Sequence, residues 1–309
     1  MTHSTLNCRG RLLDLSRPVV MGILNVTPDS FFDGGRHDDE VSALKQAEKM
    51  LSEGAAILDV GGASSRPGAA EVPEQEELRR VIGVVESIRR YFPEAIISID
   101  TWRAGVARAT VQAGASIVND ISGAAPPSPP GGGEKAPLLD YPPNAEGEMP
   151  PLPPNPKSGA FPPPPGGLGG AAYVLMHMQG TPATMQQAPH YDDVVTEVLD
   201  FFIQKIAALR AAGVYDIVLD PGFGFGKTVE HNYALLRNLH IFRAVTGLPL
   251  LVGISRKSMI CKPLSIRPEQ ALNGTSALHM VALQQGASIL RAHDVREAVE
   301  VIKLWELVR

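Results

Sequence analysis

Eight short apolar runs, each ending on polar or charged residues, constrain the fold of this chain more than any other feature. Strands buried on both faces, as in parallel sheets, read as continuous apolar runs, and eight of them alternating with helices are typical of a (β/α)8 TIM barrel. The runs are Val19–Val26, Ala56–Gly62, Ala95–Thr101, Ser116–Ser122, Tyr173–Met178, Asp216–Gly222, Leu248–Arg256 and Ala287–Asp294. Catalytic groups of this fold lie at the carboxyl ends of the strands, where these polar residues stand.

Segments with helical patterns separate the runs, and most of them are followed by a glycine. They cover residues 41–53, 73–92, 102–113, 191–212, 229–246, 268–285 and 294–309. A glycine after a helix readily adopts left-handed backbone and turns the chain into the next strand, as expected at Gly54, Gly114 and Gly286. The sequence therefore predicts an α/β fold with eight strands and seven helices, in a single domain over residues 1–309.

One helix of the repeating pattern is missing between the fourth and fifth strands. In Ala124–Ala172, 25 of the 49 residues are proline or glycine. Proline removes a backbone donor and clashes with the preceding helical turn, so no long helix can run through this segment. We expect a disordered Pro/Gly-rich insertion at 124–172 that replaces the fourth barrel helix, which leaves the neighbouring strands without their usual cover.

Charge and cysteine content exclude several classes of function. A net charge of −5 gives no overall basic surface for nucleic acid. Two cysteines in 309 residues do not make a disulfide framework, and they favour a reducing compartment. No stretch is apolar for long enough to cross a bilayer, and the first residues lack the apolar core of a signal peptide. We expect a cytoplasmic protein with no nucleic-acid or membrane partner.

The glycine-rich segment Asp220–Thr228 resembles a nucleotide-binding loop but fits neither common pattern. A P-loop would require glycine at position 221, where Pro221 stands, and the dinucleotide pattern fails because the glycines fall at 222, 224 and 226. We interpret the segment as a tight loop after the sixth strand. It aims Asp220 at the barrel mouth, where Phe223 or Phe225 can cover a flat ligand.

The ends of the last two strands favour an anion site. Loops after strands seven and eight often hold phosphate in this fold, and Lys257, Arg291 and His293 lie there. Guanidinium and ammonium groups both suit phosphate oxygens. An Arg-Lys pair alone is usually solvated surface, so the prediction depends on the combination with the neighbouring strand. His177, inside an apolar run, is more typical of a packed histidine.

Carboxylates and amides end three other strands. Asp100, Asn119 and Asp220 can together offer acceptors and donors to an aminopyrimidine ring with a lactam edge. Each residue alone more often caps its own loop or helix, so their convergence at one mouth carries the argument. Asn25, at the end of the first strand, can bind Mg²⁺ through its amide oxygen, because Mg²⁺ sites often combine few protein ligands with substrate phosphates.

Eight segments spread along the chain resemble dihydropteroate synthase, a family of pterin-binding TIM barrels. They are MGILNVTPDSFFDGG (21–35), DVGGASSRPG (59–68), SIDT (98–101), IVNDISG (117–123), VLMHMQGTP (174–182), LDPGFGFGK (219–227), GISRKS (253–258) and LRAHDV (290–295). The resemblance implies a Mg²⁺-dependent transferase of folate biosynthesis that acts as a homodimer. Such an enzyme condenses p-aminobenzoate with 6-hydroxymethyl-7,8-dihydropterin pyrophosphate, giving 7,8-dihydropteroate and pyrophosphate.

The resemblance also implies a role for individual residues. Asp100, Asn119, Asp220 and Lys257 would bind the pterin, Asn25, Ser65, Arg291 and His293 the pyrophosphate, and Arg66, Pro67, Phe225 and Ser258 the p-aminobenzoate. Asn25 would also hold the Mg²⁺. Asp33, Lys257 and Asp100 would act in catalysis, with the loop after the first strand bringing Asp33 over the site.

Two departures from the family pattern leave alternatives open. Ala63 stands where the family usually has glutamate, and the fourth helix is missing. A non-catalytic homologue that binds pterin or a partner without turnover is therefore one alternative. A pterin-binding methyltransferase is another, although NVTPDSF (25–31) and SRK (255–257) argue against it, since a methyl carrier needs neither a pyrophosphate nor an aminobenzoate site.

Overall fold

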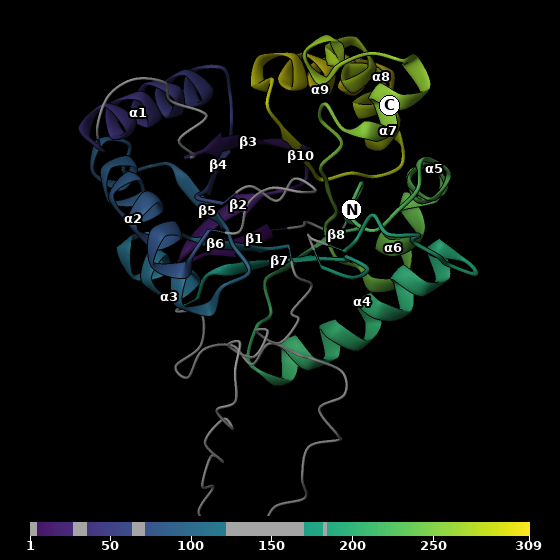
Figure 1. Ribbon diagram of the computed structural model, residues 1–309, viewed down its shortest axis with the longest axis horizontal. Coiled ribbons are helices and arrows are strands. Elements are labelled where there is room, and N and C mark those ends of the chain that lie inside the picture. The colour runs from purple at the N-terminus through teal and green to yellow at the C-terminus, as the bar shows by residue number, and fades with distance from the viewer. Residues whose placement is uncertain (1–4, 27–35, 64–71, 122–169, 182–183) are drawn as a thin grey trace, which may run out of the picture.

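An eight-stranded parallel barrel forms the centre of the protein (Figure 1). The computed structural model describes residues 5–26, 36–63, 72–121, 170–181 and 184–309, except for the side chains of 36–39. The strands are β3 (Val19–Asn25), β4 (Ile57–Gly61), β5 (Ile96–Asp100), β6 (Ile117–Asp120), β7 (Ala172–Met176), β8 (Ile217–Asp220), β9 (Leu251–Val252) and β10 (Ile289–Ala292). They follow the order β8-β7-β6-β5-β4-β3-β10-β9, and a bridge between Leu219 and Leu250 closes the ring. The eight predicted strands and the TIM-barrel fold are confirmed.

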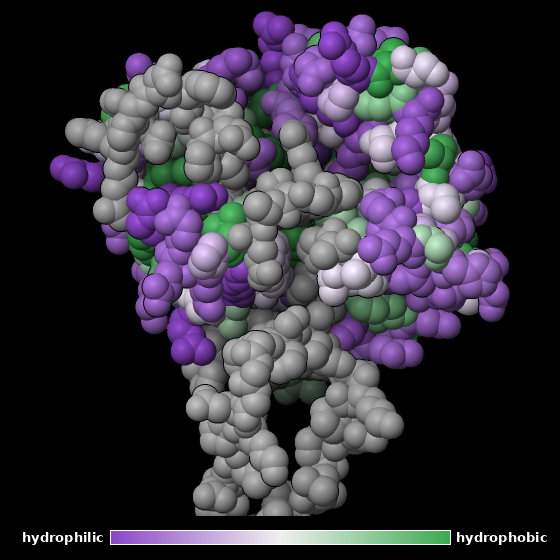
Figure 2. Space-filling view, in the orientation of Figure 1, coloured by the Kyte–Doolittle hydropathy of each residue, from purple (hydrophilic) through white to green (hydrophobic). Residues whose placement is uncertain are grey.

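Helices connect the strands and cover the outside of the barrel. They are α1 (Arg36–Ser52), α2 (Glu74–Tyr91), α3 (Ala104–Ala113), α4 (Val194–Ala211), α5 (Val229–Arg237), α6 (Leu239–Thr246), α7 (Ser258–Leu264), α8 (Leu272–Gln284) and α9 (Val295–Val308). In Figure 1, α1 to α3 lie along one side of the barrel and α7 to α9 gather on another. The face visible in Figure 2 is mostly hydrophilic outside the grey residues, as expected for the outer faces of such helices. No helix in the described ranges is long and apolar enough to cross a membrane.

Alternation along the strands divides the barrel into an inner and an outer core. On β4, Ile57 belongs to the inner cluster of apolar side chains, whereas Leu58 and Val60 join the helices in the outer one. Side chains two residues apart in a strand share a face. Asp59 therefore points into the barrel like Ile57, and the same reasoning applies to the other strands.

A β-hairpin closes the amino end of the barrel. Its strands are β1 (Thr5–Cys8) and β2 (Arg11–Asp14), which pair antiparallel. Leu6, Cys8 and Leu13 from the hairpin are buried against the first inward-facing residues of the barrel strands. This element was not predicted, because Thr5–Cys8 and Arg11–Asp14 contain no apolar run longer than two residues.

Two helical predictions differ from the structure in detail. The segment 229–246 is two helices, α5 and α6, separated at Asn238, whose side-chain amide donates to the Ala234 carbonyl at 2.9 Å. Asparagine competes in this way for backbone groups and interrupts helices. The segment 268–285 begins with a 3-10 turn at Pro268–Gln270 before α8, and the short helix α7 was not predicted.

The predicted insertion lies mostly outside the described residues. Residues 122–169 belong to that part, so the disordered segment and the missing fourth helix stay predictions, as does the single domain over 1–309. The carboxyl boundary of the insertion was wrong. Ala171 and Ala172 are buried, and Ala172 pairs with Ile117 as the first residue of β7.

Candidate active site

Five strands place a charged or amide side chain at the carboxyl end of the barrel interior. These residues are Asp59 on β4, Asp100 on β5, Asn119 on β6, Asp220 on β8 and Arg291 on β10. Four of them follow an inward-facing apolar residue by two positions, and Asp100 follows Ile96 by four, so strand alternation turns all five inward. Groups removed from water in this way need partners, and the contacts among them define the site.

Arg291 connects two of the carboxylates. Its Nε donates to Oδ2 of Asp59 at 2.6 Å, and its Nη2 donates to Oδ2 of Asp100 at 2.5 Å. Burial opposes the guanidinium charge, but Asp59 and Asp100 outweigh burial and raise the pKa of Arg291 above its ordinary value. The guanidinium is therefore charged at every physiological pH, and it ties β10 to β4 and β5.

Asp100 has a strongly raised pKa. Burial raises its pKa to about 7, Asp59 and Glu77 add to the rise, and Arg291 and Lys257 oppose it. Glu77, fully buried at the start of α2, accepts hydrogen bonds from Thr101 Oγ1 at 2.6 Å and from Arg103 Nη1 at 2.5 Å. Near neutral pH, Asp100 is therefore present in both protonation states and can donate or accept a hydrogen bond.

Two buried acceptors in the site have no partner among the described residues. Asn119 Nδ2 donates to Asp59 Oδ2 at 3.0 Å, which fixes both side chains. The second oxygen of Asp59 and the amide oxygen of Asn119 are buried and make no hydrogen bond there. Buried acceptors without partners are rare in folded proteins, so this pair indicates the place of a ligand that carries N–H donors.

Lys257 approaches from the loop after β9. Its Nζ donates to the Phe223 carbonyl at 2.6 Å and lies 4.6 Å from the centre of the Phe225 ring. Burial lowers the pKa of Lys257 to about 8, although Asp220 and Asp100 favour its charge. Asp220 Oδ1 accepts from the Gly222 amide at 2.8 Å, and burial raises the pKa of Asp220 while Lys257 lowers it. Each of the two groups therefore favours the charged form of the other.

A second buried lysine shapes the loop between β8 and α5. Lys227 Nζ lies 2.9 Å from His177 Nδ1 and donates to the carbonyls of Phe225 at 3.0 Å and Gly222 at 3.1 Å. Burial lowers the pKa of Lys227 to about 7. Gly222 has a φ of +70°, and a Cβ there would lie 1.9 Å from the His177 carbonyl oxygen, so only glycine fits. Lys227 therefore fixes the loop that carries Phe223 and Phe225.

The sequence profile of the pterin binding enzyme family matches residues 21–135 and 169–293 of this chain. The chain belongs to the pterin-binding enzyme family. It is similar along most of its length to dihydropteroate synthases of that family. The one of Escherichia coli K12 is 48% identical over 303 residues, covering 97% of this chain and 95% of the relative. That of Haemophilus influenzae is 41% identical over 303 residues, covering 97% and 98%.

Solved structures of pterin-binding enzymes agree with this membership. Dihydropteroate synthase from Yersinia pestis, crystallised with a sulfonamide drug complex, has a TM-score of 0.80 and 43% identity, covering 99% of both chains. The Xanthomonas albilineans enzyme with 4-aminobenzoic acid has a TM-score of 0.80 and 39% identity, covering 99% of this chain and 98% of that one. The family predicted from the sequence, dihydropteroate synthase, is confirmed.

The four residues predicted to hold the pterin come together in this pterin-binding barrel. Asp100 and Asn119 are neighbours in the register of β5 and β6. Asp220 lies at the end of β8, and Lys257 interacts electrostatically with both Asp220 and Asp100. Their contact with a pterin stays a prediction, and so does the catalytic role of Asp100 and Lys257.

The residues predicted at the pyrophosphate are more dispersed. Asn25 is exposed at the end of β3 and is paired in register with Gly61. His293 Nδ1 lies 3.0 Å from Ser255 Oγ, in the loop after β9. Arg291 spends Nε and Nη2 on Asp59 and Asp100, which leaves Nη1 as the free edge of its guanidinium among the described contacts.

Two of the residues predicted at p-aminobenzoate are described. Phe225 is half-buried beneath the Lys257 ammonium, and Ser258 is exposed as the first residue of α7. The other two, Arg66 and Pro67, lie in the segment 64–71 outside the described residues, as does Ser65 of the pyrophosphate set. Asp33 lies in the segment 27–35, also outside them.

Sequence reasoning missed Asp59, Glu77 and Lys227. A carboxylate inside a buried strand was the available signal for Asp59, which stands between apolar residues in ILDVG (57–61). Glu77 lies in a charged first turn with Glu74 and Glu76, so nothing in the sequence separates it from exposed neighbours. Lys227 lies in the glycine-rich segment Asp220–Thr228, and its burial depends on the fold of that whole segment.

Proposed function

We propose that this chain condenses p-aminobenzoate with 6-hydroxymethyl-7,8-dihydropterin pyrophosphate, giving 7,8-dihydropteroate and pyrophosphate. It would do so as a pterinylmethyl transferase of folate biosynthesis. The supporting observation is the cluster of Asp59, Asp100, Asn119, Lys257 and Arg291 at one barrel mouth, in a chain that is 48% identical to a dihydropteroate synthase. A single polar strand end would be weak support for this function, but five such groups on separate elements are strong support.

Recognition of the pterin would use the acceptors at the ends of β5, β6 and β8. An aminopyrimidine ring offers several N–H donors on one edge and a lactam oxygen on another. Asp220 and the unpartnered oxygens of Asp59 and Asn119 suit the donors, and Asn119 or Lys257 suits the oxygen. Because the oxygens of Asp59 and Asn119 are buried without partners, a ligand that supplies N–H donors there removes the cost of leaving them unsatisfied.

Departure of the pyrophosphate would be favoured by cationic groups near the mouth. Arg291 keeps its charge, and His293, two residues further along the chain, adds an imidazole beside it. Negative charge grows on the leaving group as its bond to the pterin carbon weakens, and fixed cations stabilise that charge. Lys257 and Phe225 would exclude water from the carbon while the arylamine nitrogen of p-aminobenzoate attacks. No covalent bond to the protein is required.

The residues present fit a Mg²⁺ ion that is held mainly by the substrate. Within the described ranges, no group of three or more His, Cys, Asp or Glu side chains forms a metal cluster. A Cβ added at Gly61 would lie 3.6 Å from Asn25 Oδ1 and 3.6 Å from Asp100 Cβ. Gly61 therefore lies between the two side chains, and the amide oxygen of Asn25 is a hard donor beside the site. When bound, Mg²⁺ neutralises phosphate oxygens. Turnover that is unchanged in excess EDTA would contradict this assignment.

We also propose a homodimer through the last helices. Leu304, Leu307 and Val308 of α9 are exposed, with Leu307 81% accessible, and Leu264 of α7 is exposed as well. Exposed apolar side chains on the last helix suit a second copy of the same surface. Sedimentation of wild type against Leu307→Asp tests the assembly, and a wild-type monomer would rule it out.

A cytoplasmic setting is supported by two cysteines that form no disulfide.

The decisive experiment is turnover with the two proposed substrates. Purified protein should release pyrophosphate only when both the dihydropterin pyrophosphate and p-aminobenzoate are present, and 7,8-dihydropteroate should appear in equal amount. Pterin binding without turnover would support the non-catalytic homologue instead. Methyl transfer from a methylated pterin would support the methyltransferase. Lys257→Ala is the matched loss-of-function variant, since it removes a half-buried site group from the loop after β9.

A further inference from the structure

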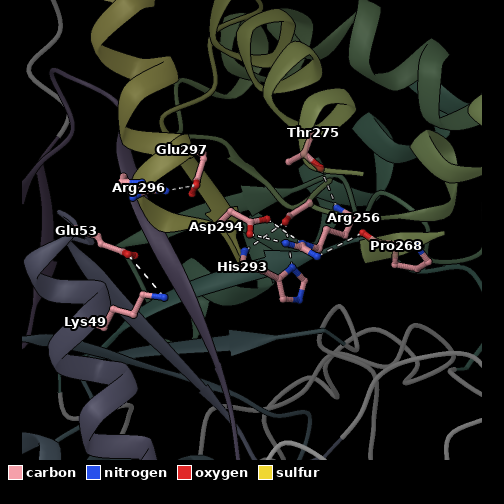
Figure 3. A network of polar contacts seen from close by, with 10 residues as sticks. Lys49, Glu53, Arg256, Pro268, Thr275, His293, Asp294, Arg296 and Glu297 are labelled. Carbon is pink, nitrogen blue, oxygen red and sulfur yellow. Dashed lines mark hydrogen bonds and ion pairs between the residues drawn. The ribbon is translucent and has the colours of Figure 1, made fainter. Parts of the chain in front are cut away.

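Arg256 connects the loop after β9 with the end of β10 at the rim of the site. Its Nε donates to Asp294 Oδ2 at 2.9 Å and its Nη2 to Asp294 Oδ1 at 2.6 Å, which is a bidentate pair (Figure 3). Asp294 immediately follows His293 and precedes α9. Arg256 immediately precedes Lys257. The pair therefore joins the two segments that carry the predicted cationic groups of the site.

A second link runs parallel to the first. Ser255 Oγ lies 3.0 Å from His293 Nδ1 and accepts from the His293 backbone amide at 3.2 Å. Ser255 is buried, whereas the Arg256 and Asp294 side chains keep 29% and 17% of their exposed area. We call Ser255, Arg256, His293 and Asp294 the rim clamp. Its two links have different chemistry but join the same two segments.

The backbone of Arg256 is held in an uncommon conformation. Its φ is +57°, in the left-handed region that non-glycine residues rarely adopt. Its amide donates to Oγ1 of the buried Thr275 on α8 at 3.1 Å, and its Nη1 reaches the Pro268 carbonyl at 3.5 Å. With the chain turned in this way, Ser255 faces His293 while Lys257 reaches the Phe223 carbonyl. Strain that persists at a functional rim indicates a geometric requirement there.

We propose that Arg256 and Asp294 are positioning residues for the pterin pyrophosphate. The pair fixes the loop after β9 on the end of β10, so that Lys257 and His293 reach the same ligand together. Arg256 and Asp294 hydrogen-bond each other, and the pair acts on the ligand through its sequence neighbours Lys257 and His293. This inference rests on the proposed function, because the ligand it positions is the pterin substrate of that reaction.

Steady-state kinetics of Arg256→Gln and Asp294→Asn test the inference. We expect the KM for the dihydropterin pyrophosphate to rise about tenfold in each variant, because a displaced Lys257 or His293 would lose about one charge-assisted hydrogen bond to the ligand. The KM for p-aminobenzoate should change less than about twofold. The double variant should lose no more than the worse single variant, since both substitutions break one interaction. A purely structural role would lower stability without producing this difference between the two KM values.

Matched variants keep the test interpretable. Glu297→Gln removes the exposed ion pair with Arg296 on the same helix and should leave both KM values at the wild-type level. Arg256→Lys keeps the charge without the planar fork and should give an intermediate KM. Thr275→Val, which acts on the Arg256 backbone through a buried residue of similar volume, should raise the same KM about threefold.

The outcomes separate this inference from the proposed function. If wild type shows no turnover, the proposed function fails, and pterin binding measured by calorimetry then tests the clamp. If wild type is active and both single variants bind and turn over the pterin substrate within twofold of it, the clamp is contradicted. Equal losses for both substrates would likewise overturn it, because they would indicate a general disturbance of the barrel.

Discussion

The two ends of the barrel interior differ in chemistry although the same strands build both. On β4, Ile57 lies at the amino end and Asp59 two residues further on, and on β10 the same step leads from Ile289 to Arg291. At the amino end the β1–β2 hairpin covers an apolar layer. At the carboxyl end, buried charges face one another, and two acceptors lack a partner within the described part of the chain.

This difference separates stability from binding along a single strand. Apolar burial at the amino end lowers the free energy of the folded state without any ligand. Buried carboxylates and amides at the carboxyl end cost free energy until a ligand satisfies them, which is the usual trade between stability and activity. Substitutions at the two ends should therefore fail in different assays.

The largest effect is expected from Arg291→Ala. The substitution leaves Asp59 and Asp100 buried without their cation, and removing one partner of a buried ion pair costs about 3–5 kcal/mol. Both the free energy of unfolding in urea and turnover should fall. Arg296→Ala, which breaks an exposed pair, should change unfolding by less than about 1 kcal/mol. Equal stabilities for the two variants would mean that Arg291 does not hold the strand ends together.

Leu6→Ala tests the amino end. Leu6 of the hairpin is 2% exposed, and replacing a buried leucine with alanine costs about 2–5 kcal/mol. Stability should drop while kcat and both KM values of the folded enzyme stay at wild-type levels. Leu12→Ala, in the same hairpin but 69% exposed, is the control and should be nearly neutral. A change in pterin affinity with Leu6→Ala would show that the two ends are coupled.

Asp220→Ala against Asp216→Ala compares the two ends of β8. Asp220 faces the mouth, so its loss should weaken pterin binding by about ten- to hundredfold, corresponding to roughly 1.5–3 kcal/mol. Asp216, just before the strand, accepts from the Asn7 amide at 2.8 Å and anchors the hairpin. Its loss should lower stability by about 1 kcal/mol and leave pterin affinity unchanged. Calorimetry that finds wild-type pterin affinity in Asp220→Ala would remove that residue from the site.

The barrel was predictable because its signal repeats. Each strand is a short apolar run followed by a polar residue, and the pattern recurs eight times with helices between. Asp100, Asn119, Asp220 and Lys257 were found in the same way, since parallel strands bring their carboxyl ends to one mouth. Local patterns of this kind need no knowledge of which side chains touch.

Contacts between distant residues were not predictable from the sequence. Arg291 was assigned to the pyrophosphate with no protein partner named, and in the fold it bonds Asp59 and Asp100, which lie 232 and 191 residues away in the chain. Lys227 contacts His177 across 50 residues. The hairpin seals the barrel through side chains that are ordinary in sequence, such as Leu6 and Cys8. These features depend on barrel closure, which no short window of sequence contains.

The smallest effect concerns the pH dependence set by Asp100. Its pKa of about 7 in the folded protein exceeds the ordinary value of 3.8, so the associated stability is complete below 3.8 and is lost as pH rises through 7. Relative to Asp100→Asn, wild type should therefore lose about 1 kcal/mol of unfolding free energy between about pH 6 and pH 7.5. Arg291 lowers this pKa, so the loss is smaller than burial alone would give. Urea unfolding at several pH values measures the difference, and Asp192→Asn at an exposed position is the control. If the difference between wild type and Asp100→Asn is the same at every pH, Asp100 does not carry the cost of the polar end. The free energy that the ligand must offset would then lie with Asp59 or Asp220 instead.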